Sequence, residues 1–304
     1  MLKTEKVIKN ILVVRNDRFG EFLLNIPALR ALRETFTGAR ITAMVNPYVK
    51  ELAECIPFVD EVWTKAQKTE LKRRKFDIAV MLNPSKEWNL LTFFSGIPVR
   101  VGYDRKFGFL LTHKIRDMKY LGEKHEVEYN LDLVSLIGAR TEDKSLAFNL
   151  SGGFASDFDL AIHPWTSDPI KEWPLANFRK LIERLARETD LKIAIIGGKE
   201  EEQKSIVLCS GLEGRVDNFT GKTTLIELAA LLKKSRLLVS ADSGPVHLAA
   251  CIGTPVIALF RSDMPGKSAR RWGPWGTNHS VIEKDVLADI NVEEVLNKIR
   301  EKVK

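Results

Sequence analysis

The sequence predicts an α/β protein made of two doubly wound domains, each built on a parallel sheet. Short apolar runs of strand length alternate with amphipathic segments of helical period through both halves of the 304-residue chain. A polar stretch over 141–157, which contains Gly152 and Gly153, separates the two sets and has the composition of a linker. We therefore expect one domain over 1–150, a second over 151–285 and a terminal helical segment over 286–304, since domains average roughly 150 residues.

In the first half, an apolar run predicts a buried strand over 9–15, followed by a loop over 16–20. The next segment, 21–35, has apolar residues at helical spacing, and Pro27 is expected to divide it into a short turn and a longer helix. Further strands are expected over 39–45, 61–63, 76–82 and 99–102, and further helices over 48–55 and 125–136.

The second half repeats this alternation. Pro174 and Pro245 each mark a helix start, because proline has no N–H to lose in the first turn. The expected strands are 159–163, 192–197, 237–240 and 255–260, and the expected helices are 174–187, 200–209, 224–232, 245–252 and 292–303.

Composition indicates a soluble protein from a reducing compartment. The three cysteines are scattered and show no spacing typical of a zinc site, so we expect no bound metal and a cytoplasmic location. The longest apolar stretch, 237–260, contains Asp242 and His247 together with turn residues, and it is not expected to span a membrane.

The net charge of +7 is concentrated in the first half, where residues 1–150 hold 25 Lys and Arg against 19 Asp and Glu. The basic residues form two clusters, over 65–75 and 100–119. Such clusters attract phosphates, nucleic acid or an anionic membrane surface, although a basic cluster can equally be a solvated face. Aromatic residues are not interleaved as stacking platforms in the first cluster, so we do not expect it to bind single-stranded nucleic acid.

The loop 15–21 is the first candidate site, because it joins the first strand to the first helix at the edge where parallel sheets bind ligands. It lacks the GxGxxG pattern of dinucleotide-binding loops. We expect Glu21 or Asp17 to act there as a general base. Each carboxylate also has a simpler interpretation, since Glu21 complements the helix dipole and Asp17 caps the helix or pairs with Arg15 or Arg18.

The loop 163–174 is the second candidate site. The hydroxyls of Thr166 and Ser167, the charge of Lys171 and the amides at the helix start together suit a phosphate group. Lys171 would then face a departing diphosphate. Alternatively, Lys171 is a surface lysine before a capped helix. His163 and His247 each have the alternative interpretation of a hydrogen-bonded histidine in the core.

Two further loops follow strands in the second half. Gly197 and Gly198 leave room for a ligand near the backbone, and Glu200 is placed to accept from ribose hydroxyls, although an acidic first helical turn explains Glu200 equally well. The triplet 242–244 precedes a helix, so its amides are expected to form an anion site, with Asp242 beside them to accept from sugar hydroxyls. An ordinary strand-to-helix turn with Asp242 as the cap explains the triplet equally well.

Together these motifs resemble glycosyltransferase family 9, the ADP-heptose:lipopolysaccharide heptosyltransferases. The likeness runs in the correct order along nearly the whole chain. The segments that carry it are 11–21, 27–32, 57–62, 100–103, 163–174, 197–198, 242–250, 253–256 and 271–274.

The resemblance implies a GT-B fold, with two Rossmann-like domains facing across a cleft and the C-terminal helix returning to the first domain. It also implies direct inverting displacement without an essential metal or cofactor. The family's base is an aspartate whose position here holds Glu21, and Asp17 is the other candidate. The candidate catalytic residues are thus Glu21, Asp17 and Lys171; the candidate donor-binding residues are His163, Thr166, Ser167, Lys171, Gly197, Gly198, Glu200, Asp242, Ser243, Gly244 and His247; the candidate acceptor-binding residues are Arg15, Arg18, Gly20, Arg105 and Lys106.

The expected reaction moves heptose from ADP-heptose to a lipopolysaccharide-core acceptor, either lipid A–Kdo or an inner-core heptose. The expected partners are the nucleotide sugar, an anionic glycolipid and the inner face of the cytoplasmic membrane, with neither nucleic acid nor a protein partner. The alternatives are a transferase for another sugar or nucleotide, a nucleotide-sugar binding protein without transfer, and an epimerase or hydrolase on the same scaffold.

Overall fold

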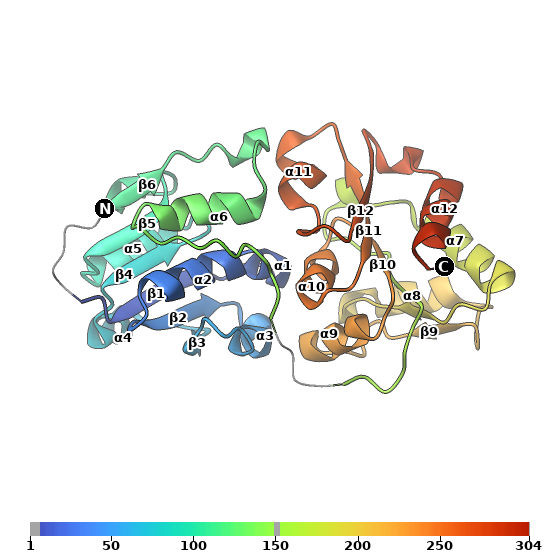
Figure 1. The fold of residues 1–304 in the computed structure, drawn as a ribbon, viewed down its shortest axis with the longest axis horizontal. Helices are drawn as coiled ribbons and strands as arrows, with labels where there is room; N and C mark the ends of the chain where they lie inside the picture. The colour runs from blue at the N-terminus through green and yellow to red at the C-terminus, as the bar shows by residue number, and fades with distance from the viewer. Residues whose placement is uncertain (1–6, 149–152, 304) are drawn as a thin grey trace. The chain divides into compact units, whose positions relative to one another are not determined.

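The computed structural model describes residues 7–148 and 153–303. The chain forms two compact units, Met1–Phe148 and Asn149–Lys304 (Figure 1). They divide inside the predicted linker; the predicted boundary at residue 150 and Gly152 lie outside the described residues. Each unit contains a six-stranded sheet whose neighbouring strands all run parallel, so the predicted α/β class is confirmed.

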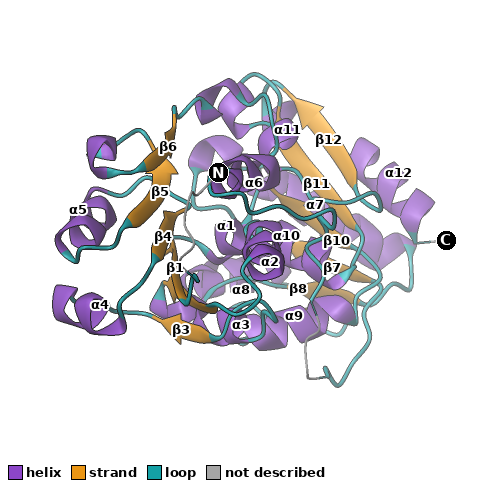
Figure 2. Cartoon of the chain, turned by 60° about the vertical axis from the view of Figure 1, so that its left-hand side comes forward, coloured by secondary structure: helices purple, strands orange, loops and turns teal. Residues whose placement is uncertain are grey.

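The first unit orders its strands β3-β2-β1-β4-β5-β6. Figure 2 shows α4 and α5 on one side of this sheet and α2 and α3 on the other. The bounds are β1 (Asn10–Arg15), α1 (Phe19–Leu23), α2 (Ile26–Thr35), β2 (Arg40–Val45), α3 (Lys50–Glu54), β3 (Glu61–Trp63), α4 (Lys68–Arg74), β4 (Ile78–Met81), α5 (Lys86–Phe94), β5 (Val99–Tyr103), β6 (His113–Ile115) and α6 (Glu126–Ser135).

The second unit orders its strands β12-β11-β10-β7-β8-β9, which is the same topology in its own sequence order. Its elements are β7 (Leu160–His163), α7 (Leu175–Glu188), β8 (Ile193–Ile195), α8 (Glu202–Cys209), β9 (Val216–Asn218), α9 (Leu225–Lys233), β10 (Leu238–Ala241), α10 (Gly244–Ile252), β11 (Val256–Arg261), α11 (Ala269–Trp272), β12 (Ser280–Lys284) and α12 (Val292–Lys302).

Each sheet has one point where the strand order reverses, between β1 and β4 in the first unit and between β7 and β10 in the second. In open parallel sheets, ligands bind outside the carboxyl ends of the strands at this point. The loops that leave β1, β7 and β10 there are the ones over 16–18, 164–168 and 242–243. Three of the candidate loops therefore lie where the topology favours a ligand.

Several element boundaries differ from the predicted ones. The loop predicted over 16–20 is shorter, because helix α1 begins at Phe19, and the predicted division at Pro27 is confirmed, since Pro27 occupies the first turn of a separate helix α2. The sequence patterns missed α4, α5, α11, β6, β9 and β12. These elements are short or present polar and aromatic side chains outward, so they lack the periodicity on which the prediction relied.

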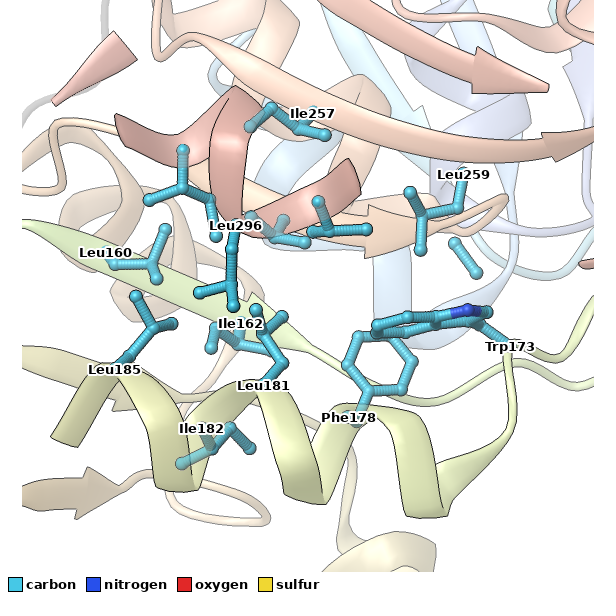
Figure 3. Close-up of a cluster of buried hydrophobic side chains, with 14 of the residues drawn as sticks. Leu160, Ile162, Trp173, Phe178, Leu181, Ile182, Leu185, Ile257, Leu259 and Leu296 are labelled. Carbon is cyan, nitrogen blue, oxygen red and sulfur yellow. The ribbon is translucent and has the colours of Figure 1, made fainter. Parts of the chain in front are cut away.

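The core of the second unit lies between its sheet, α7 and α12. Figure 3 shows Leu296 from α12 among Leu160, Ile162 and Leu181, and all four side chains are fully buried. Trp173 is also fully buried, and its indole N–H donates to the Ile290 carbonyl at 2.8 Å. The predicted terminal helix thus packs within the second unit, and its return to the first domain stays a prediction.

Within the described residues, no helix combines the length and the apolar character needed to cross a membrane.

Candidate functional site

The Glu21 carboxyl lies at the start of α1, directly beyond the carboxyl end of β1. Its Oε2 accepts the Arg18 backbone N–H at 3.1 Å, and this place in the first turn agrees with the simpler interpretation that Glu21 complements the helix dipole. Burial raises the pKa of Glu21, and the charge of Asp17 raises it further. A raised pKa makes the Glu21 carboxylate a stronger proton acceptor, which a general base requires, and its role as the base stays a prediction.

Arg15 and Asp17 belong to a buried polar network. Arg15 Nε donates to Asp17 Oδ1 at 2.8 Å, while Arg15 Nη1 donates to the Leu82 carbonyl at 3.2 Å and lies 3.4 Å from Glu126 Oε1. The same Glu126 oxygen accepts from Lys119 Nζ at 2.6 Å. Arg15 is only 4% exposed, so it holds the β1 loop against the residue after β4 and against α6. Its contact with an acceptor stays a prediction.

The other predicted acceptor residues occupy different environments. Arg18 is exposed, whereas Gly20 is buried in α1. Arg105 and Lys106 are both exposed in the loop after β5, and Arg105 Nη1 pairs with Asp117 at 2.8 Å. The structure thus places these two cations at solvent and ties one of them to a carboxylate.

In the second unit, Lys171 and Asp242 come together across the point where the strand order reverses. Lys171 Nζ lies 2.5 Å from Asp242 Oδ2, and the two side chains are 17% and 9% exposed. Lys171 follows β7 and Asp242 follows β10, which are hydrogen-bonded neighbours in the sheet. Lys171, which is predicted to contact a phosphate, and Asp242, which is predicted to contact a sugar, therefore form one ion pair.

The loop that carries Lys171 is shaped by its own polar residues. Thr166 Oγ1 accepts the Asp168 N–H at 3.3 Å, and Asp168 Oδ1 accepts the Ile170 N–H at 3.3 Å. Ser167 is exposed. The Thr166 hydroxyl therefore supports the loop, while Ser167 faces solvent beside it.

His163 has the features of a hydrogen-bonded core histidine. It is buried, its Nδ1 lies 3.1 Å from Ser240 Oγ, and burial lowers the pKa of His163 to about 3. Ser240 Oγ in turn lies 2.8 Å from Ser243 Oγ. A neutral His163 therefore positions the Ser243 hydroxyl through Ser240, which supports the alternative interpretation of His163.

Helix α10 begins at Gly244, with Ser243 as its N-cap residue. The Ser243 side chain makes no capping hydrogen bond to the helix, because its hydroxyl turns toward Ser240. The amide of Gly244 lies in the first turn, where the helix dipole favours an anion. His247 lies one turn further along α10 and is 4% exposed.

Gly197 is explained by packing. A Cβ added there would fall 2.5 Å from Trp165 Cδ1 and 2.9 Å from Thr220 Cγ2, so only glycine fits. Gly198 donates its N–H to Glu201 Oε2 at 2.9 Å, while Glu200 is exposed. Glu201, and not Glu200, thus caps this helix start. A contact with ribose stays a prediction for Gly197, Gly198 and Glu200.

Sequence patterns missed three side chains that shape these loops. Tyr48 accepts the Phe19 N–H at 3.1 Å, Lys267 Nζ pairs with Asp168 Oδ2 at 2.9 Å, and Arg261 Nη1 donates to the Ile170 carbonyl at 3.2 Å. Each partner is distant in sequence, so no local signal could identify it. Arg261 thus contacts the backbone next to Lys171.

Across residues 7–148 and 153–303, no group of three or more His, Cys, Asp or Glu side chains is arranged to hold a metal ion.

Comparisons with known proteins give a consistent match. The family model for glycosyltransferase family 9 (heptosyltransferase) matches residues 64–298. The chain is 21% identical over 340 residues to the lipopolysaccharide core heptosyltransferase OpsX of Haemophilus influenzae, covering 96% of each sequence. It is 22% identical over 293 residues to lipopolysaccharide heptosyltransferase 3 of Escherichia coli K12, covering 85% of this chain and 83% of that one.

Among solved structures, the E. coli ADP-heptose lipopolysaccharide heptosyltransferase II matches with a TM-score of 0.82 at 21% identity. The match covers 97% of this chain and 98% of that one. The predicted GT-B fold class is thereby confirmed.

Proposed function

The chain belongs to glycosyltransferase family 9, and we propose that it transfers heptose from ADP-heptose to a lipopolysaccharide-core acceptor with inversion at the anomeric carbon. The relatives named as lipopolysaccharide heptosyltransferases support this reaction, and the name of one solved relative includes ADP-heptose. The acceptor is lipid A–Kdo or an inner-core heptose. Donor chemistry is assigned to the second unit and the proton acceptor to the first.

The ion pair of Lys171 with Asp242 is the observation that supports the donor site most directly. A bound diphosphate shares Lys171 with Asp242 and accepts from the amides at the start of α10. Asp242 accepts in turn from hydroxyls of the sugar. As the diphosphate departs, its growing negative charge is stabilised by Lys171 and the helix start rather than by a metal ion.

The proposed step is a single displacement. The acceptor hydroxyl oxygen attacks the anomeric carbon and forms the new C–O bond while the bond from that carbon to the diphosphate oxygen breaks. The bonding electron pair leaves with ADP, and the hydroxyl proton passes to the Glu21 carboxylate. The transition state has oxocarbenium character, and base catalysis of this kind contributes about 10²–10⁴-fold in rate.

The acceptor is anionic, and the first unit offers exposed cations for it. Arg18, Arg105 and Lys106 are exposed there, and residues 1–150 carry the excess of basic residues. Acceptor lipids are met at the inner face of the cytoplasmic membrane, so the protein works as a peripheral enzyme on that surface.

Calorimetric titration with ADP, UDP and GDP tests the donor assignment. We expect selective binding of ADP without added metal. Lys171→Ala should weaken ADP binding by about 10- to 100-fold, since a hydrogen bond to a charged group contributes roughly 1.5–3 kcal/mol. Lys180→Ala, an exposed lysine on α7 of the same unit, is the matched control and should leave the affinity unchanged.

The other outcomes separate the alternatives. A preference for UDP or GDP would keep sugar transfer and reject ADP-heptose as donor. Donor binding without turnover on any lipopolysaccharide-core acceptor would indicate a binding protein, and sugar conversion without acceptor would indicate an epimerase or hydrolase.

A further inference from the structure

The outer surface of α4, α5 and the following 3₁₀ turn (Gly108–Leu110) combines exposed aromatic rings with cations. Figure 2 shows α4 and α5 side by side on one face of the first unit's sheet. Four phenylalanines are exposed on α5, on the turn or directly before the turn, at 42% for Phe93, 56% for Phe94, 37% for Phe107 and 72% for Phe109. We call these four rings, with Lys68, Lys86 and Arg100, the aromatic–basic surface.

The rings form two pairs. Phe93 and Phe94 pack edge to face with centroids 5.4 Å apart, and Phe107 and Phe109 do the same at 5.6 Å. The Asn89 side chain donates to the Lys106 carbonyl at 2.9 Å, which joins α5 to the loop that carries the second pair. The pairs therefore belong to one fixed surface.

Cations lie over these rings. Lys68 Nζ is 5.4 Å from the Phe94 centroid, Arg100 Cζ is 5.4 Å from the Phe93 centroid, and Lys86 Nζ is 4.9 Å from the Phe107 centroid. Charge in the surrounding sequence is one-sided, because residues 65–119 hold 13 Lys and Arg against 5 Asp and Glu, a net of +8. This excess is larger than the net charge of the whole chain, which is +7.

We propose that the aromatic–basic surface docks the protein on an anionic lipid bilayer, with the phenylalanine rings entering the interface and the cations meeting lipid phosphates. Exposed aromatic side chains flanked by Lys and Arg are the combination that interfacial binding requires, because apolar burial and attraction to anionic lipids add together. The aromatic–basic surface is where the first unit would contact the membrane. The proposal rests on the proposed function in one respect, which is that the acceptor lipid lies in that membrane.

A nucleic-acid strand fits the surface less well. Bases stack on open faces of aromatic rings, whereas three of these four rings already have a cation over a face. Insertion into lipid uses the exposed ring edges and leaves the cations in place to contact phosphates.

Sedimentation of the full-length protein with vesicles tests this surface without donor, acceptor or turnover. We expect binding to vesicles containing phosphatidylglycerol, weakening with added salt, and little binding to vesicles of phosphatidylcholine alone. Phe94→Ser with Phe109→Ser should reduce the partition coefficient by about 10-fold or more, because two large apolar side chains no longer enter the interface. Lys68→Gln with Lys86→Gln should reduce it by about fivefold per lysine.

Matched controls come from α8 in the second unit, where Val207 is 73% exposed and Lys204 is also exposed. Val207→Ser and Lys204→Gln should bind vesicles like the unchanged protein, and circular dichroism should show every variant folded. The proposal is overturned by equal binding to neutral vesicles, by no binding at low salt, or by unchanged binding of the folded double variants. It is also overturned if a single-stranded oligonucleotide binds more tightly than anionic vesicles and the same substitutions abolish that binding. None of these results depends on heptose transfer, so a failure here leaves the proposed function to its own test.

Discussion

The Glu21 carboxyl combines a fixed position with a proton affinity suited to its proposed role. Its hydrogen bond from the Arg18 amide holds it at the start of α1, and burial raises its pKa. A glutamate reaches one methylene further than the aspartate that the resemblance implies at this position, and the Arg18 N–H holds the longer side chain at the helix start. Asp17 points instead to Arg15, which pairs with it at 2.8 Å.

Asp17→Asn tests how the loop sets the proton affinity of Glu21. The charge of Asp17 raises the pKa of Glu21, while that of Arg15 lowers it. Removing the carboxylate deletes the first effect and frees Arg15 to exert the second, so the pKa of Glu21 should fall. Because the deprotonated form is the active base, the acid limb of kcat/KM should move to lower pH, as measured by a pH–rate profile.

A plateau rate in Asp17→Asn that drops as far as in Glu21→Gln would identify Asp17 as the base. An acid limb that stays in place would show that Asp17 does not influence Glu21.

His163 should make the free energy of unfolding depend on pH. Burial lowers the pKa of His163 to about 3 in the folded state, whereas an unfolded histidine titrates near 6.5. Between these values the unfolded chain binds the additional proton, so stability is complete above about pH 6.5 and is lost progressively as the pH falls toward 3. From pH 7.5 to 5.5 this residue should cost about 1.4 kcal/mol.

Urea unfolding at both pH values measures this effect. His163→Asn keeps a polar side chain near Ser240 without a titrating group, so its stability loss over that interval should be smaller than that of the unchanged protein by about the same 1.4 kcal/mol. Equal losses in the two proteins would show that His163 is protonated in the folded state.

The sequence identified the loop positions but not the interactions of the residues in them. Glu21, Lys171 and Asp242 stand next to strand ends, and that position can be read from apolar runs and helix starts. Their partners cannot be read in this way, because the ion pair of Lys171 and the network of Arg15 join residues 71 and 111 positions apart. Burial then sets the pKa values, and burial depends on the whole fold.

The loops after β7 and β8 form one packed unit through Trp165 and Gly197. The Trp165 indole N–H donates to the Ile196 carbonyl at 3.1 Å, and the ring occupies the space that a side chain at Gly197 would need. The sequence suggested that Gly197 leaves room for a ligand, whereas in the structure the room is taken by tryptophan.

Gly197→Ala should therefore destabilise the protein. The added methyl meets the ring of Trp165, which is buried and hydrogen-bonded, and overpacking of this kind costs about 1–3 kcal/mol. Gly38→Ala is the matched control, because a Cβ there meets nothing within 4 Å. Chemical denaturation of both variants measures the difference, and a Gly197→Ala protein as stable as the Gly38→Ala control would mean that Trp165 does not constrain this loop.

The elements that could be predicted are those with strong apolar patterns. Strands β1, β7, β10 and β11 are nearly all buried, and their apolar runs identified them. The edge strands β6, β9 and β12 have mostly half-buried or exposed residues, because each has a neighbour on one side only. Helix α5 carries Phe93 and Phe94 on its exposed side, which hides the usual division into an apolar and a polar face.

The two units of the chain share one sheet topology, but their candidate residues differ in chemical type. Both sheets have the same strand order, and Glu21, Lys171 and Asp242 each come after a strand that flanks the reversal point of its sheet. The first unit supplies a carboxyl with a raised pKa and the basic excess, and the second supplies an ion pair and a helix start. This division predicts that substitutions in the two units affect separate steps.

The most direct test of the account is the rate of heptose transfer by Glu21→Gln, measured together with its affinity for ADP. Glutamine keeps an oxygen that can accept the Arg18 N–H, so the loop should stay folded while the proton acceptor is lost. We expect transfer from ADP-heptose to the lipopolysaccharide-core acceptor to slow by about 10²–10⁴-fold, with ADP affinity unchanged because Lys171 and Asp242 lie in the other unit. A Glu21→Gln protein that transfers heptose at the full rate would contradict the assignment of Glu21 as the base.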